Sequence, residues 1–231
     1  MIGLVLPPGV LHRSAYGGEL DHAPLHPEEL PAVARAVDKR RREYAAGRAC
    51  AREALGQLGI PPGPILRDPH RGAPQWPDGV VGSITHCDGY RAAAVARSSD
   101  MLALGIDAEP HAALPEGVLD AVLATDAERA RLAELAGSAP AVHFDRLLFS
   151  AKETVYKSWY PYHHRMLGFH EAELLLHTDP GVTDRGGYTA RVLVPGPLLA
   201  EGVGPDTFTG RWAVRDGLLV TAIAVPAGRA A

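Results

Sequence analysis

Two carboxylates alternate with apolar residues near the middle of the chain, in the segment Gly105-Ile106-Asp107-Ala108-Glu109-Pro110. Side chains of a strand alternate between its two faces, so Asp107 and Glu109 point to the same side. Neighbouring carboxylates repel each other unless a cation lies between them, and oxygen ligands at this spacing suit Mg²⁺. The spacing is also typical of a strand that runs out into a solvated turn, so both interpretations stand at this point.

A third carboxylate, Glu153, lies on a helix predicted over residues 142–160. One stripe of this helix is apolar, and the opposite side carries aromatic residues where charged ones are usual. The stripe comprises Phe144, Leu147, Leu148, Ala151, Val155 and Ser158, and the aromatic residues are Phe149, Tyr156 and Tyr160. Glu153 and Lys157 could be an exposed pair that contributes about 0.2–0.5 kcal/mol. A helix that is apolar on both sides favours a sandwiched position instead, which makes Glu153 a candidate metal ligand and Lys157 a candidate phosphate contact.

Arginines flank the apolar stripe of another predicted helix, over residues 31–58. With Tyr44 at the centre of the stripe, Arg40 and Arg48 lie about 40° to either side, at roughly 100° per residue. A core-facing helix usually carries apolar residues at these positions. The two side chains could extend over the edge of the core, pair with acids, or face an anion, which guanidinium groups bind well.

A small hydroxyl-rich segment, Gly82-Ser83-Ile84-Thr85-His86, follows two valines and precedes another predicted strand. Amides and hydroxyls at such a turn can bind a phosphate, although this pattern alone is weak. The sequence contains no zinc-ligand spacing, no GxxxxGK[ST] phosphate loop and no GxSxG nucleophile elbow. Those three site types are therefore excluded.

Helical and strand patterns alternate along the chain, which predicts a mixed α/β or α+β fold. Helices are expected over residues 31–58, 117–136 and 142–160, and strands over residues 80–85, 90–96, 101–108, 188–194 and 211–225. We expect Pro31 in the first turn of the first helix and Pro161 at the end of the third.

Composition restricts the possible partners. The chain has 231 residues, 46% of them hydrophobic and 22% charged, which is typical of a globular protein. A net charge of −4 argues against binding to nucleic-acid backbones, which needs a dense basic surface. The longest apolar run, residues 218–227, is shorter than the ~20 residues that span a bilayer, and the N-terminus lacks a signal-peptide pattern. Two cysteines cannot form a disulfide framework, so we expect a cytoplasmic protein without nucleic-acid or membrane partners.

Taken together, these residues resemble the 4′-phosphopantetheinyl transferases, in particular the larger, pseudo-dimeric type related to the surfactin-synthetase and enterobactin activators. Actinobacterial members are the most similar. Two family signatures carry the resemblance: a G-[IV]-D-x-E strand and, about forty residues later, a [WF]-x-x-K-E-[SAT]-x-x-K helix. They correspond here to residues 105–109 and 149–157, while residues 82–86 and the arginine-bearing helix match two further signatures. The similarity covers roughly residues 30–225, and the first 25 residues match little.

The resemblance implies a mixed α+β fold of two similar α/β halves about a pseudo-twofold axis, which form one catalytic unit over residues 1–231. Residues 1–104 would bind the phosphates of coenzyme A, and residues 105–231 would carry the metal and catalytic motifs. The implied reaction transfers 4′-phosphopantetheine from coenzyme A to a serine of an acyl or peptidyl carrier protein and releases 3′,5′-ADP. Such carriers belong to fatty-acid, polyketide or non-ribosomal peptide synthases. Because one chain supplies both walls of the cleft, a monomer is expected.

Roles for individual side chains also follow from the resemblance. Asp107, Glu109 and Glu153 would bind Mg²⁺, with Mn²⁺ as an alternative, and so neutralise the pyrophosphate leaving group. Glu153 would accept the serine proton directly or through water, and Lys157 would stabilise the transferred phosphoryl group. Because an ammonium cannot bind a cation, Lys157→Met is expected to lower the transfer rate without altering its dependence on Mg²⁺. Contacts to the nucleotide and its phosphates would come from Arg40, Arg48, Arg67, Arg71, Ser83, Thr85, His86 and Lys157.

Two other functions could use the same residues. A Mg²⁺-dependent coenzyme A or nucleotide pyrophosphohydrolase would need the three carboxylates but would release phosphopantetheine into water. A binding module that had lost catalysis would have no need for the complete set of three carboxylates and Lys157. The presence of all four residues argues against such a module.

Overall fold

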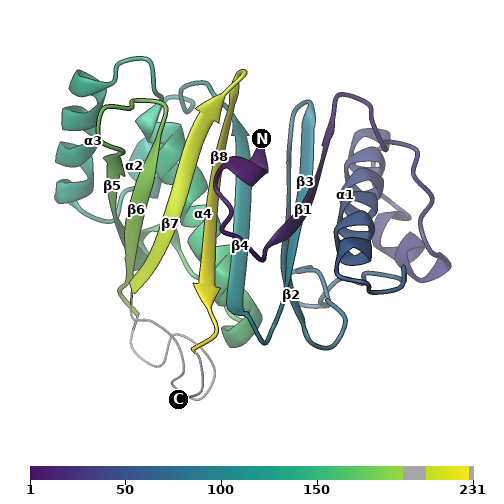
Figure 1. Ribbon diagram of the computed structural model, residues 1–231. Helices are drawn as coiled ribbons and strands as arrows, with labels where there is room; N and C mark the ends of the chain where they lie inside the picture. The colour runs from purple at the N-terminus through teal and green to yellow at the C-terminus, as the bar shows by residue number, and fades with distance from the viewer. Residues whose placement is uncertain (195–206, 229–231) are drawn as a thin grey trace.

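The computed structural model describes residues 1–194 and 207–228 and contains two antiparallel sheets with helices packed against them (Figure 1). The smaller sheet has the order β1-β3-β2, with β1 (Leu11–Tyr16), β2 (Val80–Cys87) and β3 (Tyr90–Arg97). The larger sheet has the order β4-β8-β7-β6-β5, with β4 (Met101–Pro110), β5 (Ala172–Thr178), β6 (Arg185–Val192), β7 (Thr207–Arg215) and β8 (Leu218–Pro226). The fold is therefore mixed α+β, which confirms the expected class.

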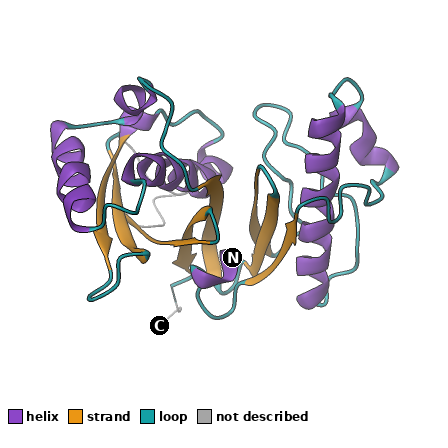
Figure 2. Ribbon diagram, turned by 90° about the horizontal axis from the view of Figure 1, so that it is seen from above, coloured by secondary structure: helices purple, strands orange, loops and turns teal. Residues whose placement is uncertain are grey.

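The helices divide between the two sheets (Figure 2). They are α1 (Asp38–Gln57), α2 (Val118–Val122), α3 (Asp126–Ser138) and α4 (Phe144–His163), with 3-10 helices η1 (Ile2–Leu4), η2 (Pro27–Val33) and η3 (Phe169–Glu171). Helix α1 packs against β1 and β3, whereas α4 packs against β4 and β8. Each half thus has one long helix across an antiparallel sheet. In the described part of the chain, none of the helices has the length and apolar character needed to cross a membrane.

Short side chains let α1 lie close to the smaller sheet. Ala46, Ala51 and Ala54 of this helix are completely buried. A Cβ added at Gly47 would come within 3.1 Å of Ile84 on β2. The close approach brings the arginines of α1 near the edge of β2.

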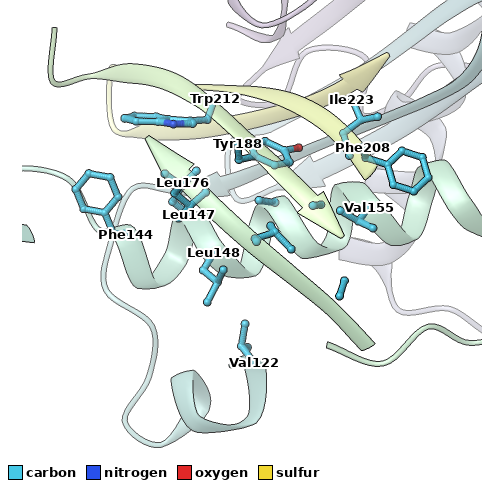
Figure 3. Packing of buried hydrophobic residues seen from close by; sticks show 14 of the residues in the cluster. Val122, Phe144, Leu147, Leu148, Val155, Leu176, Tyr188, Phe208, Trp212 and Ile223 are labelled. Atoms are coloured by element: carbon cyan, nitrogen blue, oxygen red, sulfur yellow. The ribbon is translucent and has the colours of Figure 1, made fainter. Parts of the chain in front are cut away.

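Large apolar side chains fix α4 on the larger sheet. Leu147 and Val155 are completely buried in a cluster that also draws on the strands (Figure 3). At Gly105 of β4, a Cβ would collide with the Ser158 hydroxyl and the Thr154 carbonyl, so a larger residue would push the helix away. This glycine therefore places the polar residues of α4 directly beside those of β4.

A seam formed by Ser83 and Thr85 of β2 and by Ile106 and Ala108 of β4 joins the two sheets. The Ile106 amide donates a hydrogen bond to the Ser83 hydroxyl (3.1 Å), and the Ala108 amide donates one to the Thr85 hydroxyl (3.0 Å). An apolar cluster drawn from both halves packs beside this seam. The expected division at residue 104 falls inside β4, and all of β4 pairs within the larger sheet, so strand pairing divides the chain between β3 and β4.

The structure corrects two of the expected helices. The helix expected over residues 31–58 begins only at Asp38, because Pro31 lies inside the separate 3-10 helix η2. The helix expected over residues 117–136 is interrupted between α2 and α3. Thr125 caps α3 by accepting a hydrogen bond from the Glu128 amide (3.2 Å), and this cap starts a new helix.

Helix α4 continues past Pro161, contrary to expectation. It extends to His163, whose ring stacks on Trp159 with centroids 4.1 Å apart, and His164 in a left-handed conformation ends it. A proline in the last turn removes only one of the helical hydrogen bonds.

The sequence predicts β2, β3 and β4 well but the other strands only in part. The strand expected over residues 211–225 is the β7–β8 hairpin, because Asp216 and Gly217 adopt positive φ and form a two-residue turn. The strand expected over 188–194 corresponds to the second half of β6. Neither β1 nor β5 is predicted, since polar residues interrupt their apolar alternation.

Candidate active site

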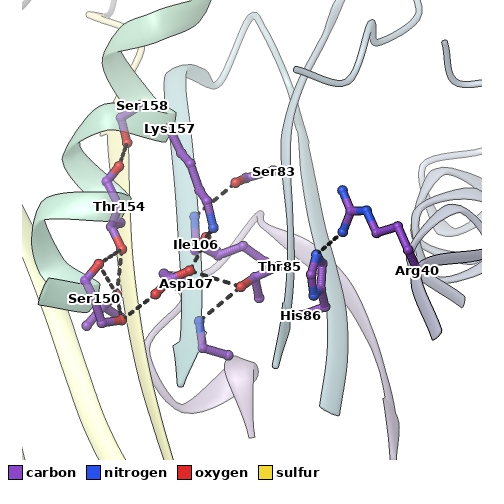
Figure 4. Close-up of polar contacts among 12 residues, drawn as sticks. Arg40, Ser83, Thr85, His86, Ile106, Asp107, Ser150, Thr154, Lys157 and Ser158 are labelled. Atoms are coloured by element: carbon purple, nitrogen blue, oxygen red, sulfur yellow. Dashed lines mark hydrogen bonds and ion pairs between the residues drawn. The ribbon is translucent and has the colours of Figure 1, made fainter. Parts of the chain in front are cut away.

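The two predicted catalytic elements, β4 and α4, meet at an ion pair. The Lys157 ammonium donates to Asp107 Oδ1 (2.7 Å) and to the Ile106 carbonyl (3.1 Å) (Figure 4). The Asp107 side chain is 7% exposed and the Lys157 side chain 25%. The sequence predicts that these two residues belong to one site, and the structure places them in direct contact.

Hydroxyl groups donate to both oxygens of Asp107. Thr85 donates to Oδ1 (3.1 Å), and Ser150 of α4 donates to Oδ2 (2.7 Å). Ser150 also shares a hydrogen bond with Thr221 of β8 (2.9 Å), so the carboxylate is fixed from both sheets. Sequence reasoning missed Ser150 and Thr221, because buried hydroxyls within apolar segments look like ordinary core residues.

Glu109 is held by an arginine that the sequence analysis also missed. Arg146 Nη1 donates to Glu109 Oε2 (2.9 Å), while the rest of its guanidinium binds the carbonyls of Ala112 and Ala113. Burial raises the pKa of Glu109, as does the negative charge of Asp107, and Arg146 opposes both effects. Arg146 therefore fixes both the carboxylate and the loop that follows β4.

Glu153 lies near the same acidic group. Burial raises the pKa of Glu153; the charge of Asp107 adds to this increase, whereas Lys157 counteracts it. Three carboxylates that influence one another suit Mg²⁺ in donor chemistry. Among the residues described, however, no three His, Cys, Asp or Glu side chains are gathered into a group that could hold a metal ion. Asp107 and Glu109 instead contact Lys157 and Arg146.

Positive charge gathers on the other side of β2, under α1. Arg40 Nη1 lies 2.6 Å from His86 Nε2 (Figure 4). His86 Nδ1 lies 3.6 Å from Glu43 Oε2. Burial lowers the pKa of His86, and the neighbouring Arg40 lowers it further. A neutral His86 can accept the hydrogen bond from Arg40, and Glu43 orients the imidazole.

Arg48 is buried without an acidic partner. Its guanidinium lies 4.3 Å from the centre of the Tyr44 ring, and Nε donates to the Ile65 carbonyl (2.7 Å). Arg48 is only 5% exposed, yet no carboxylate of the described residues lies within ion-pair distance of it. The Tyr44 hydroxyl is buried beside the Arg48 guanidinium and forms no hydrogen bond of normal geometry with the described residues. Both groups line one cavity of about 120 Å³.

Two adjoining cavities form a cleft between α1 and α4. The cavity beneath α1 is lined in part by Arg40, Arg48, Arg67 and His86. A neighbouring cavity of about 200 Å³ is lined in part by Arg71, Trp76, Ser83, Tyr156, Lys157 and Tyr160. The two share Gly72, Pro74 and Ile84. The structure therefore brings most of the predicted nucleotide contacts to one cleft, whereas Thr85 is 2% exposed and belongs to the seam.

Lys152, the first lysine of the helical motif, faces away from this cleft. Its ammonium donates to Glu128 Oε2 (3.0 Å) and to the carbonyls of Val122 and Phe169 (2.7 and 2.9 Å). It thus holds α2, α3 and η3 on α4. The two lysines of this motif therefore have different partners: Lys152 contacts Glu128, and Lys157 contacts Asp107.

Comparison with known proteins agrees with this geometry. Residues 26–96 match the 4′-phosphopantetheinyl transferase N-terminal domain, and residues 103–192 match the 4′-phosphopantetheinyl transferase superfamily. The chain is 55% identical over 234 residues to the 4′-phosphopantetheinyl transferase Svp of Streptomyces mobaraensis, covering 100% of this chain and 92% of that protein. The chain belongs to the 4′-phosphopantetheinyl transferase superfamily.

Other transferases of the superfamily align over nearly the whole chain. It is 47% identical to Npt of Nocardia iowensis, with 97% of this chain and 99% of that protein covered. It is also 47% identical to PptT of Mycobacterium tuberculosis, with 96% of this chain and 97% of that protein covered. The two matched domains meet between β3 and β4, where strand pairing divides this transferase. The alignment with Svp also includes the first 25 residues, which the motifs do not cover.

Proposed function

We propose that this transferase moves 4′-phosphopantetheine from coenzyme A to a serine hydroxyl of an acyl or peptidyl carrier protein and releases 3′,5′-ADP. One observation carries the proposal: a single cleft is lined by arginines and His86 on the α1 side and by Lys157 on the α4 side, and Lys157 is paired with the carboxylate of Asp107. Coenzyme A needs both, since its nucleotide phosphates are anionic and its pyrophosphate bond must be broken.

The α1 side of the cleft would bind the nucleotide phosphates. Arg40, Arg48, Arg67 and His86 present cationic or donor groups to one cavity. A buried Arg48 without an acid and a buried Tyr44 hydroxyl without a hydrogen bond of normal geometry both gain a hydrogen-bond acceptor from a phosphate. The aromatic lining of the adjoining cavity suits the less polar pantetheine arm.

The α4 side would carry the chemistry. Asp107, Glu109 and Glu153 are the residues that would hold Mg²⁺, or Mn²⁺, which when bound supplies positive charge to the departing pyrophosphate oxygen. The serine oxygen attacks the β-phosphorus as the bond to 3′,5′-ADP breaks. Glu153 accepts the serine proton, directly or through water, and Lys157 donates to the transferred phosphoryl group.

We further propose that the enzyme acts as a cytoplasmic monomer on carriers of fatty-acid, polyketide or non-ribosomal peptide synthases. Cys50 and Cys87 are free and buried, as suits a reducing compartment. Both cleft walls come from one chain, so the described cleft needs no second copy.

Intact-mass spectrometry of an apo carrier protein incubated with enzyme, Mg²⁺ and coenzyme A tests the proposal. We expect the carrier to gain one phosphopantetheine, and a carrier with its serine changed to alanine to gain none. Free phosphopantetheine without a change in carrier mass would indicate the pyrophosphohydrolase. Binding of coenzyme A without any product would indicate a binding module.

A further inference from the structure

The ammonium of Lys157 contacts Asp107 Oδ1, and Lys157 lines the cleft whereas Asp107 does not. Asp107 Oδ2 points to Ser150 within the core, whereas Oδ1 accepts hydrogen bonds from Thr85 of the seam and from Lys157. Lys157 lines the cleft and is more exposed than the carboxylate that it covers. A cation that enters the cleft therefore meets the ammonium before it reaches Asp107.

Two cations cannot both occupy this oxygen. Oδ1 already accepts two hydrogen bonds, and a carboxylate oxygen offers about two lone-pair sites. Positive charges at neighbouring sites of a half-buried cleft repel each other strongly. Lys157 is the mobile partner, because its four-carbon side chain can swing while Thr85 is held in the seam.

We propose that Lys157 is a displaceable counter-ion of Asp107: it occupies the carboxylate in the ligand-free protein and leaves when a divalent cation binds. The inference rests on the proposed function for the assignment of Asp107 as a metal ligand. Once displaced, the ammonium is free to reach a phosphate in the same cleft. Metal and coenzyme A then favour each other's binding, and this coupling is reciprocal.

This inference reverses one expectation from the sequence, namely that Lys157→Met leaves the dependence on Mg²⁺ unchanged. Removal of a competing ammonium should tighten the binding of Mg²⁺ even though the transfer rate falls. A purely structural ion pair predicts the opposite, since its loss would leave Asp107 less ordered and metal binding unchanged or weaker.

Calorimetric titration with Mg²⁺ alone, without coenzyme A, tests the inference. Compared with wild type, Lys157→Met should bind Mg²⁺ about tenfold more tightly, the equivalent of losing one competing hydrogen bond between charged groups. Arg71→Met is the matched control, because it removes one positive charge from the same cleft without a contact to Asp107. Asp107→Asn should lose the heat of binding, which ties the signal to this carboxylate.

Three results would overturn the inference: unchanged or weaker Mg²⁺ binding by Lys157→Met, an equal gain in Arg71→Met, or binding that persists in Asp107→Asn. If Lys157→Met is poorly folded by circular dichroism, Lys157→Gln replaces it in the same titration. Thermal unfolding supplies a second readout, in which Mg²⁺ should stabilise Lys157→Met more than wild type. Carrier modification by the wild-type enzyme is measured separately, so failure of the proposed function would be visible there and not here.

Discussion

Helices α1 and α4 are each 20 residues long and each cross an antiparallel sheet, but their polar residues have different partners. In α4, Lys157 and Lys152 both contact carboxylates. In α1, Arg48 contacts an aromatic ring and a carbonyl, although it is nearly as deeply buried as Lys152. Lys157 and Lys152 are thus already paired with acids, whereas Arg48 is the buried cation that we propose binds an anion.

The first prediction sharpens the assignment of chemistry to α4. Glu153→Gln keeps the size and one oxygen but loses the charge and the proton acceptor. The transfer rate should fall roughly 10²–10⁴-fold, the usual contribution of a general base, while coenzyme A still binds. Single-turnover rates at several Mg²⁺ concentrations measure this effect. If excess Mg²⁺ fully restored the transfer rate of Glu153→Gln, Glu153 would be a metal ligand only, and the general base would be a water molecule or another residue.

The same variant has a pH signature in the ligand-free protein. Because burial raises the pKa of Glu153, its ionised form destabilises the fold above that pKa. Glu153→Gln should therefore unfold at a higher temperature than wild type at neutral pH. The difference should shrink as the pH falls through the raised pKa, since a protonated glutamate resembles glutamine. A difference that grows on acidification would contradict the burial argument.

A second prediction separates the two lysines of α4. Lys152→Met breaks a pair whose side chains are 2% and 1% exposed, which leaves Glu128 as an unpaired buried charge. We expect the free energy of unfolding to fall by about 3–5 kcal/mol. Denaturant unfolding measures this loss, and coenzyme A affinity of the folded fraction should not change. A specific loss of transfer per folded molecule would place Lys152 in the catalytic group instead.

A third prediction compares two arginines one turn apart on α1. Arg48→Met should weaken coenzyme A binding about 10–100-fold, because a charge-assisted hydrogen bond to phosphate is lost. Arg52 is the matched control, since it contacts the fully buried Glu29 at 3.0 Å. Arg52→Met should lower stability and leave the coenzyme A Kd unchanged. Equal effects of both variants on Kd would remove the special role of Arg48.

The smallest expected effect concerns the orientation of Asp107. Ser150→Ala removes the donor to Oδ2 but leaves Lys157 and Thr85 in place. Transfer should slow roughly fivefold, in keeping with about 1 kcal/mol for one hydrogen bond. Steady-state rates with saturating coenzyme A and carrier measure it, and Ser150→Thr should recover part of the loss. A decrease as large as that of Glu153→Gln would mean that Ser150 contacts the reacting groups.

Side-chain periodicity predicts the centre of this site because its residues lie on regular elements. Asp107 on its strand and Lys157 on its helix are 50 residues apart, yet each is recognisable from local spacing, and their contact follows from the packing of α4 on Gly105. The apolar stripe of α4 is predicted for the same reason. In β4 and α4, the structure suggested by the local sequence pattern is the one that tertiary packing produces.

The supporting residues are harder to predict, because nothing local distinguishes them. Arg146 reaches Glu109 only when the loop after β4 folds back on α4, and Glu43 meets His86 only across two elements. Two element boundaries, by contrast, carry local signals in the sequence. Thr125-Asp126-Ala127-Glu128 is a helix-start pattern, and Asp216-Gly217 is a hairpin-turn pattern.

The seam between β2 and β4 joins the two halves of this chain as an interface joins two subunits. One half carries the arginines proposed to bind phosphate and the other the carboxylates proposed to bind the metal. The seam's two hydrogen bonds run from amides of the larger sheet to hydroxyls of the smaller one. A ligand that contacts both the α1 side and the α4 side of the cleft would therefore oppose opening of the seam. In the ligand-free protein, hydrogen exchange at the amides of Ile106 and Ala108 would report opening of the seam. In the ligand-bound protein, exchange at the same amides would report unfolding of the whole chain. With substrate bound, the two halves would therefore unfold together as one cooperative unit.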